Sequence, residues 1–198
     1  ATIKYALNNN SLFLYSDLGV PGDTPIAGRW TNSMTHDGVG VFRPSNGLIY
    51  LKQNLTSGFA DYTMVLGVPG DIGLAGDWNG DGVDSPGVYR PSKTTFYLTN
   101  KVQNGSVFGD YSVAMGTAGD LPLVGDWIGQ GHAGIGIFRP SNGVMYLKNQ
   151  LTAGAPDLQV IFGVANDIPL AGHWSALGTL PSSATTQPTP KIAPTFVP

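Results

Sequence analysis

The feature that most constrains this chain is a pattern of twelve residues that ends in tryptophan and occurs four times. Its shared positions are Gly-x-x-(Gly/Asn)-Asp, followed after a short variable stretch by Gly-x-Trp. Self-similarity at a fixed period of this size indicates a solenoid, a propeller or an array. The copies contain all four tryptophans, which are 48, 49 and 47 residues apart, and they are Gly19–Trp30, Gly67–Trp78, Gly116–Trp127 and Gly163–Trp174. The chain is therefore expected to fold as a set of equivalent units.

The composition suits short strands joined by many turns. Gly and Pro, 28 and 15 of 198 residues, exceed a fifth of the chain, and only 12% is charged, which favours an all-β protein. A net charge of -3 without a basic run gives no electrostatic footprint for nucleic acid. The chain has no cysteine, and no apolar stretch approaches the ~18–20 residues of a membrane-spanning helix. Low charge with abundant Gly, Thr, Asn and Ser favours an extracellular or cell-surface bacterial protein.

One complete repeat, residues 72–115, predicts four short strands separated by turn residues. The expected strands are Leu74–Trp78, Gly87–Arg90, Phe96–Asn100 and Tyr111–Met115. Strands of this length with alternating polarity form a four-stranded antiparallel blade. The same order recurs in residues 24–66 and 121–162, with Tyr50, Tyr97 and Tyr146 at one place in the third strands.

The fourth repeat is split between residues 168–188 and 3–18. Leu170–Trp174 matches a first strand, residues 182–187 a degenerate second, Ile3–Leu7 a third and Leu12–Leu18 a fourth. Building one blade from both termini closes a ring and removes open sheet edges, whereas an open array begins at a repeat boundary. We therefore predict that residues 1–188 form an all-β, four-bladed β-propeller, with an eight-bladed ring of two chains as the alternative.

Residues 189–198 form a Pro-rich tail or connector. The chain becomes rich in Pro, Thr and Ser from about Leu180, a composition typical of extended linkers. We expect Ile192, Phe196 and Val197 to dock on the propeller or on a neighbouring chain, so the tail would mediate assembly.

One loop of the second repeat has the spacing of a calcium site. Asp77, Asn79 and Asp81 place oxygen atoms on alternate residues, and the glycine at the sixth position allows a sharp turn. The carbonyl of Val83, with Asp84 or water, would complete the shell of one calcium ion. The alternative is an Asx-rich turn that satisfies its own backbone.

The stretch Gly76–Asp84, followed by Gly87–Ser92, resembles the FG-GAP and VCBS-type repeats of calcium-loop β-propellers, which include integrin α-chain heads and some fungal lectins. The resemblance extends over about residues 3–188, but the metal loop is well formed only here, and Ser85 stands where the family usually has an acid. The resemblance implies an extracellular, non-enzymatic binding or scaffold module, often attached to other domains.

Charged residues recur at equivalent positions of the repeats. Those preceding the tryptophans, Arg29, Asp77, Asp126 and His173, would surround the central channel. They form either a ligand site or, as we favour, a self-neutralising set of structural pairs, since buried charges are normally paired. A second set at the ends of second strands implies a repeated structural role, and its members are Arg43, Arg90 and Arg139.

The sequence favours a non-enzyme. It has no Gly-x-Ser-x-Gly, His-Glu-x-x-His or phosphate-loop motif, although His36, His132 and His173 could meet at one rim of the ring. We expect a non-catalytic extracellular module for protein–protein or surface assembly, with one structural calcium. A calcium-dependent lectin that binds glycans is the alternative, and a secreted hydrolase is a third.

Overall fold

The structure is a computed structural model that describes residues 2–7, 12–165 and 167–172, with side chains from Leu18 onward. Over these residues the chain is all-β, and a 3-10 turn at Pro91–Lys93 is the helical element. No helix within this described part is long and apolar enough to cross a membrane.

Three sheets contain four antiparallel strands each, taken in chain order. The first sheet consists of β3 (Thr24–Gly28), β4 (Gly38–Arg43), β5 (Leu48–Lys52) and β6 (Tyr62–Val65). The second consists of β7 (Ile72–Gly76), β8 (Ser85–Arg90), β9 (Thr95–Leu98) and β11 (Tyr111–Ala114). The third consists of β12 (Leu121–Gly125), β13 (Gly134–Arg139), β14 (Val144–Lys148) and β15 (Leu158–Ile161). The all-β prediction and the antiparallel order within these sheets are confirmed.

The first strand of the second sheet begins and ends two residues earlier than the sequence predicts. In the second sheet β7 spans Ile72–Gly76 rather than Leu74–Trp78. Trp78 has left the strand, and its indole Nε1 donates to the carbonyl of Pro86 at 3.3 Å. Trp30 and Trp127 make the same bond to Val39 and Ile135. The tryptophan therefore folds back over its own sheet, which requires the chain to turn before it.

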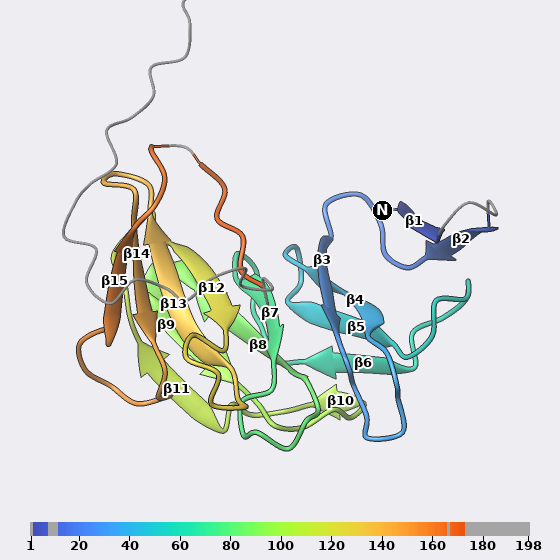
Figure 1. The fold of residues 1–198 in the computed structure, drawn as a ribbon. Helices are drawn as coiled ribbons and strands as arrows, with labels where there is room; N and C mark the ends of the chain where they lie inside the picture. Colours follow the sequence, from blue (N-terminus) through green and yellow to red (C-terminus); the bar gives the residue numbers. More distant parts are fainter. Residues whose placement is uncertain (1, 8–11, 166, 173–198) are drawn as a thin grey trace, which may run out of the picture.

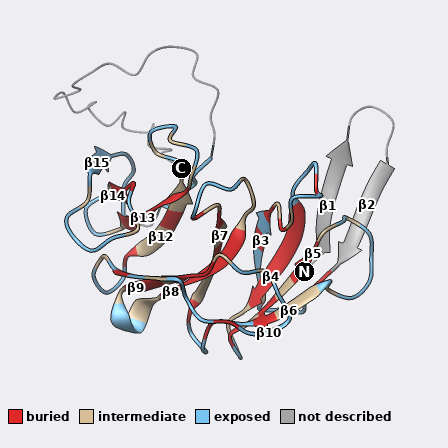
Figure 2. Cartoon of the chain, turned by 90° about the horizontal axis from the view of Figure 1, so that it is seen from below, coloured by how far each residue is buried: buried red, intermediate tan, exposed pale blue. Residues whose placement is uncertain are grey.

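The sheets follow one another across the molecule, and their first strands are in contact (Figure 1). β7 contacts β3 on one side and β12 on the other. Between the first two sheets, Phe42, Ile49 and Met64 pack with Val88 of β8. Between the second and third, Phe96 and Val113 pack with Ile137 of β13. The burial colours of Figure 2 show this core along the middle strands.

A glycine in each second strand makes room for these cores. A Cβ on Gly87 would lie 2.6 Å from Leu98 Cδ2 and 3.2 Å from Trp78 Cζ2. The glycine therefore gives the tryptophan ring and the leucine of the third strand access to the same face of the sheet.

The outer edge of the first sheet is covered by a segment of the second repeat. β10 (Gly105–Ser106), from the connection between β9 and β11, pairs in parallel with Met64 and Val65 of β6. Asn104 Oδ1 accepts the N–H of Thr63 at 2.8 Å, and the N–H of Val107 donates to Val65 O at 3.0 Å. The side chain of Val107 is buried between the first two sheets.

A fourth four-stranded sheet is not present in the described part of the chain. β1 (Thr2–Leu7) and β2 (Leu12–Asp17) form an antiparallel hairpin, at the opposite end of the molecule from β15 (Figure 1). Residues 167–172, where the sequence predicts the next first strand, form no strand, and Ile168 and Leu170 are exposed. The predicted strand at 182–187, His173 and the tail residues Ile192, Phe196 and Val197 lie outside the described residues.

Candidate functional site

Each sheet carries an arginine that binds both an aspartate and a tyrosine. In the third sheet, the guanidinium of Arg139 donates to both Asp120 oxygens at 3.0 and 2.8 Å and lies 4.6 Å from the Tyr146 ring centroid. The same arrangement joins Asp23, Arg43 and Tyr50 in the first sheet and Asp71, Arg90 and Tyr97 in the second. The repeated arginines therefore have the structural role predicted for them, with the aspartate of the twelve-residue pattern as their partner.

These contacts lower the pKa of two of the aspartates. The hydrogen bond from Arg43 holds the pKa of Asp23 below its usual value, against the opposing effect of burial. Burial raises the pKa of Asp120, but hydrogen bonds from Arg139 and Thr117 outweigh it, so this pKa is also lowered. Both carboxylates are therefore held in their charged form as structural anchors.

The loop predicted to bind calcium is ordered by its own side chains. The carboxylate of Asp77 accepts the N–H groups of Gly80, Asp81 and Gly82 at 2.7, 3.2 and 2.8 Å. Asp81 Oδ1 accepts the N–H of Val83 at 2.8 Å, and Asn79 Nδ2 donates to Asp81 Oδ2 at 2.9 Å. These contacts are those of an Asx-rich turn, so a calcium ion would have to share oxygens that already accept hydrogen bonds.

The fifth predicted ligand, Asp84, is turned toward the first sheet. Its Oδ2 accepts the N–H of Arg29 at 2.8 Å, and its own N–H donates to Arg29 O at 2.8 Å. Arg29 Nη2 in turn donates to the carbonyl of Gly82. Burial raises the pKa of Asp84, the N–H of Arg29 opposes this, and the carboxylates of Asp37 and Asp77 add to the rise. Arg29 and Asp84 therefore connect neighbouring sheets.

The third sheet repeats part of this loop chemistry. Asp126 accepts the N–H groups of Gln130 and Gly131 at 2.9 and 2.8 Å. Burial raises the pKa of Asp126, but the backbone N–H groups of its loop outweigh it, so the pKa lies below its usual value. The N–H of Ala133 donates to Asp77 O at 2.6 Å. The residues before Trp30 and Trp78, Arg29 and Asp77, are therefore points of contact between successive sheets.

An open hollow of about 400 Å³ lies between these loops of the second and third sheets. The polar side chains that line it are Asp77, Asp84, Asp126 and His132, and small residues of β7 and β12 line it as well. The hollow is acidic, although the carboxylates of Asp77 and Asp126 accept hydrogen bonds from N–H groups of their own loops. Among the described residues, no group of three or more His, Asp or Glu side chains is placed to hold a metal ion.

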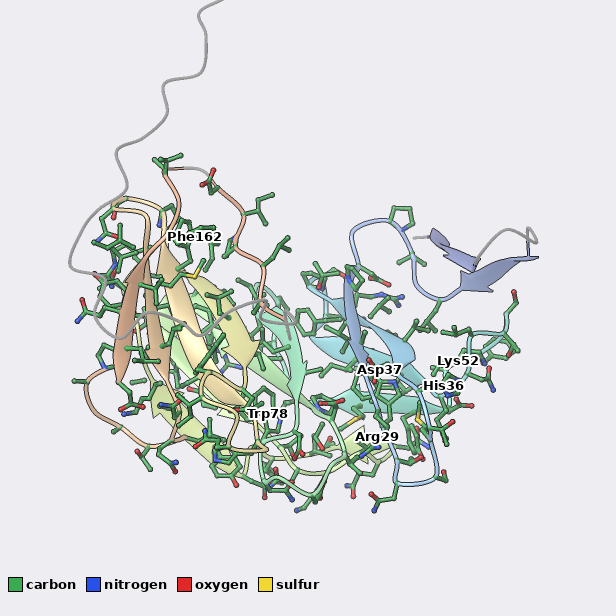
Figure 3. The ribbon with its side chains drawn as sticks, in the orientation of Figure 1. Arg29, His36, Asp37, Lys52, Trp78 and Phe162 are labelled. Carbon is green, nitrogen blue, oxygen red and sulfur yellow. The ribbon has the colours of Figure 1, made fainter. Side chains whose placement is uncertain are left out.

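The structure brings some of the predicted site residues together and separates others. Asp77 and Asp126 line the hollow, and Arg29 contacts the Asp77–Asp84 loop. His36, next to Asp37 in the first sheet's loop, is exposed (Figure 3). The fourth member of the predicted channel ring, His173, lies outside the described residues.

The third sheet exposes apolar positions that its two counterparts bury. Met64 and Val113, on the fourth strands of the first two sheets, are 0% and 1% exposed, whereas Val160 on β15 is 41% exposed. Trp30 and Trp78 are buried, and Trp127 is only half-buried. In the first two sheets this face is covered by the next sheet. No sheet in the described part of the chain covers it in the third.

The residue after the fourth strand is likewise more exposed in the third sheet than in the other two. Leu66 and Met115 pack against the cores between successive sheets, and Leu18, after β2, is 5% exposed beside Val39 and Val41. Phe162, after β15, is 74% exposed and lies far from Arg29 and Asp37 (Figure 3). The structure thus identifies an apolar surface at the end of the third sheet that sequence reasoning did not single out. Its signal was the run from Leu158 to Ala165, which contains no charged residue.

Comparisons of this chain with protein-family models, with curated proteins and with solved structures found no match.

Proposed function

We propose that this chain is a non-catalytic extracellular module that binds another protein chain or itself and serves as a scaffold. The observation that carries the proposal is the apolar outer strand of the third sheet, β15, on which Leu158 is 40% and Ile161 63% exposed and whose outer side pairs with no strand of the described residues. Contiguous exposed apolar surface on a protein marks a site of interaction. The sheets behind it are held by Asp–Arg–Tyr contacts and continuous apolar cores, so the surface is presented on a stable support.

The proposal includes a four-bladed ring in which each sheet is one blade. Two observations support it. The face of the third sheet is uncovered, with Val160 41% exposed. Leu18, after β2, packs with Val39 and Val41 of the first sheet, as Leu66 and Met115 pack at the cores between successive sheets. The connection from β2 to β3, residues 18–23, has the same length as residues 66–71 and 115–120 between the other sheets. The β1–β2 hairpin would then precede the first sheet as β5–β6 precede the second, with residues from 168 onward completing the fourth blade.

Selection of a displayed peptide library on the full chain tests the binding function. We expect selected peptides to lose binding to an Ile161→Lys variant, because a charged edge residue blocks strand addition, and to keep binding to a Phe108→Ser control, because Phe108 is exposed elsewhere. A glycan array probed with and without calcium should show no specific signal. Peptides that bind the Ile161→Lys variant as well as the wild type, together with a specific glycan signal, would favour the lectin alternative.

A further inference from the structure

The outer edge of the third sheet differs from the outer edges of the other two. β6 is covered by β10, and β11 carries the small side chains of Ser112 and Ala114 on its exposed positions. β15 has Leu158, Val160 and Ile161, all substantially exposed, and no strand of the described residues pairs with its outer side. Figure 2 shows this strand as exposed throughout. An uncovered apolar edge strand is a template for pairing with another strand.

The backbone groups available on this edge follow from the ladder with β14. The N–H of Phe162 donates to Gly143 O at 3.2 Å, and Val160 stands opposite Met145. Because ladder bonds alternate along an antiparallel pair, the N–H and C=O groups of Gln159 and Ile161 point away from β14. Four unpaired backbone groups therefore lie in a row beside exposed apolar side chains.

Closing the ring would not cover this edge. A following blade covers the face of its neighbour, and the edge of the first sheet is covered only because the connection from β9 to β11, residues 99–110, is long enough to reach β6. The corresponding connection of the proposed fourth blade, between β1 and β2, consists of residues 8–11 alone. The occupant of the β15 edge must therefore come from outside the ring.

We propose that two copies of this chain associate by antiparallel pairing of their β15 strands about a twofold axis at Val160. In this register the N–H and C=O of Gln159 pair with those of Ile161 in the second copy, which satisfies all four groups. Such an interface is self-complementary, as twofold symmetry requires. No charged residue lies between Leu158 and Ala165, so the strands meet without the repulsion that like charges cause across a pair. This inference rests on the proposed assembly function and identifies its partner as a second copy.

Analytical ultracentrifugation of the full chain across a wide concentration range tests the proposal. We expect the average mass to rise toward twice that of the monomer, and Ile161→Lys to weaken association by about tenfold or more, since charged edge residues block strand addition. Ala114→Lys, at the equivalent position of β11, is the matched control and should associate as the wild type does. A wild type that stays monomeric at all concentrations overturns the proposal, as does equal weakening by both lysine variants.

A crosslink tests the register without relying on a charged variant. The chain has no cysteine, so Val160→Cys introduces a single thiol. Residues facing each other at the axis would form a non-hydrogen-bonded pair with Cα atoms ~4.5 Å apart, a separation that a disulfide can bridge. Mild oxidation should yield a covalent dimer from Val160→Cys and not from Ala114→Cys. Equal or absent crosslinking in the two overturns the pairing, while peptide binding to the third sheet would leave the proposed function standing.

Discussion

At the scale of single residues, the Asp120–Arg139 pair shows how the repeated pattern stabilises a sheet. The Asp120 side chain is 2% exposed and accepts hydrogen bonds from Nε and Nη2 of Arg139. Breaking a buried pair leaves an uncompensated charge. We expect Arg139→Met to lower the free energy of unfolding by about 3 kcal/mol, and Asp120→Asn/Arg139→Met by less, measured by urea denaturation. Asp167→Asn is the control, since Asp167 belongs to the same kind of turn but has no arginine among the described residues.

The same aspartates predict how stability changes with pH. The pKa values of Asp23 and Asp120 are lowered on folding from 3.8. Their contribution is therefore complete above pH 3.8 and is lost as the pH falls through their folded values. The raised pKa of Asp84 acts in the opposite direction, because protonation of this group favours the folded state. We expect a stability maximum in mildly acidic buffer and a steep loss of stability at lower pH. Urea denaturation at a series of pH values measures both. The loss should be shallower in Arg139→Met, and stability that kept rising in strong acid would contradict this account.

Substitutions in the Asp77 loop can distinguish its two predicted roles, an Asx-rich turn and a calcium site. In the presence of a chelator, we expect Asp77→Ala to cost about 2 kcal/mol, because three loop N–H groups lose their acceptor. Calcium binding, predicted from the sequence, would add a calcium-dependent rise in wild-type stability that Asp81→Ala lacks. Thermal unfolding of the three proteins with calcium and with chelator measures both effects. If Asp77→Ala were as stable as the wild type in chelator, the hydrogen bonds of the turn would not contribute to stability as proposed.

The sequence predicted the structural role of the repeated arginines but not the residues that they contact. The recurrence of Arg43, Arg90 and Arg139 revealed a structural role, because three copies seldom share an accidental function. Their partners could not be deduced, since an aspartate in a turn also satisfies local N–H groups, as Asp71 does with Val68. The contact between Arg29 and Asp84 depends on how neighbouring sheets approach, which no local pattern encodes.

At the scale of elements, turn residues and alternating apolar positions were sufficient to place the strands of three sheets. The ends were displaced where a side chain made a non-local contact, as Trp78 does when it folds back onto Pro86. β10 was not anticipated, because its two residues are a strand only through their pairing with β6.

The β10 cover predicts a local effect on β6. Replacing Val107 with Ala should cost about 1–2 kcal/mol, because its buried side chain fills the core between two sheets. Replacing Asn104 with Ala should speed hydrogen exchange at the Thr63 amide, whose acceptor is Asn104 Oδ1. Exchange at the equivalent amide of Ser112 in β11 should stay unchanged. Unaltered protection of Thr63 would mean that this bond contributes nothing to the stability of the edge.

At the scale of the whole molecule, the equivalent positions of the sheets differ in what covers them. Val160, Trp127 and Phe162 are more exposed than their counterparts in the first two sheets. Local sequence alone would make these positions equivalent, so the difference arises from the neighbour that each sheet has. The third sheet therefore has the composition of an interior surface and the exposure of an exterior one.

Phe162 discriminates between a closed ring and an open row of three sheets. In a closed propeller the phenyl group of Phe162 would be buried, as the side chain of Leu18 is. Phe162→Ser should then lower the free energy of unfolding by about 3 kcal/mol, the magnitude typical of truncating a buried aromatic side chain. In an open row the side chain stays 74% exposed, and the substitution should fall within about 0.5 kcal/mol of neutral. Urea denaturation at low protein concentration makes the measurement without interference from dimers. Phe108→Ser, at a residue exposed outside this surface, is the control and should be neutral. We expect the large loss at Phe162, because a surface that matches two buried interfaces residue by residue is best explained by a fourth blade that covers it.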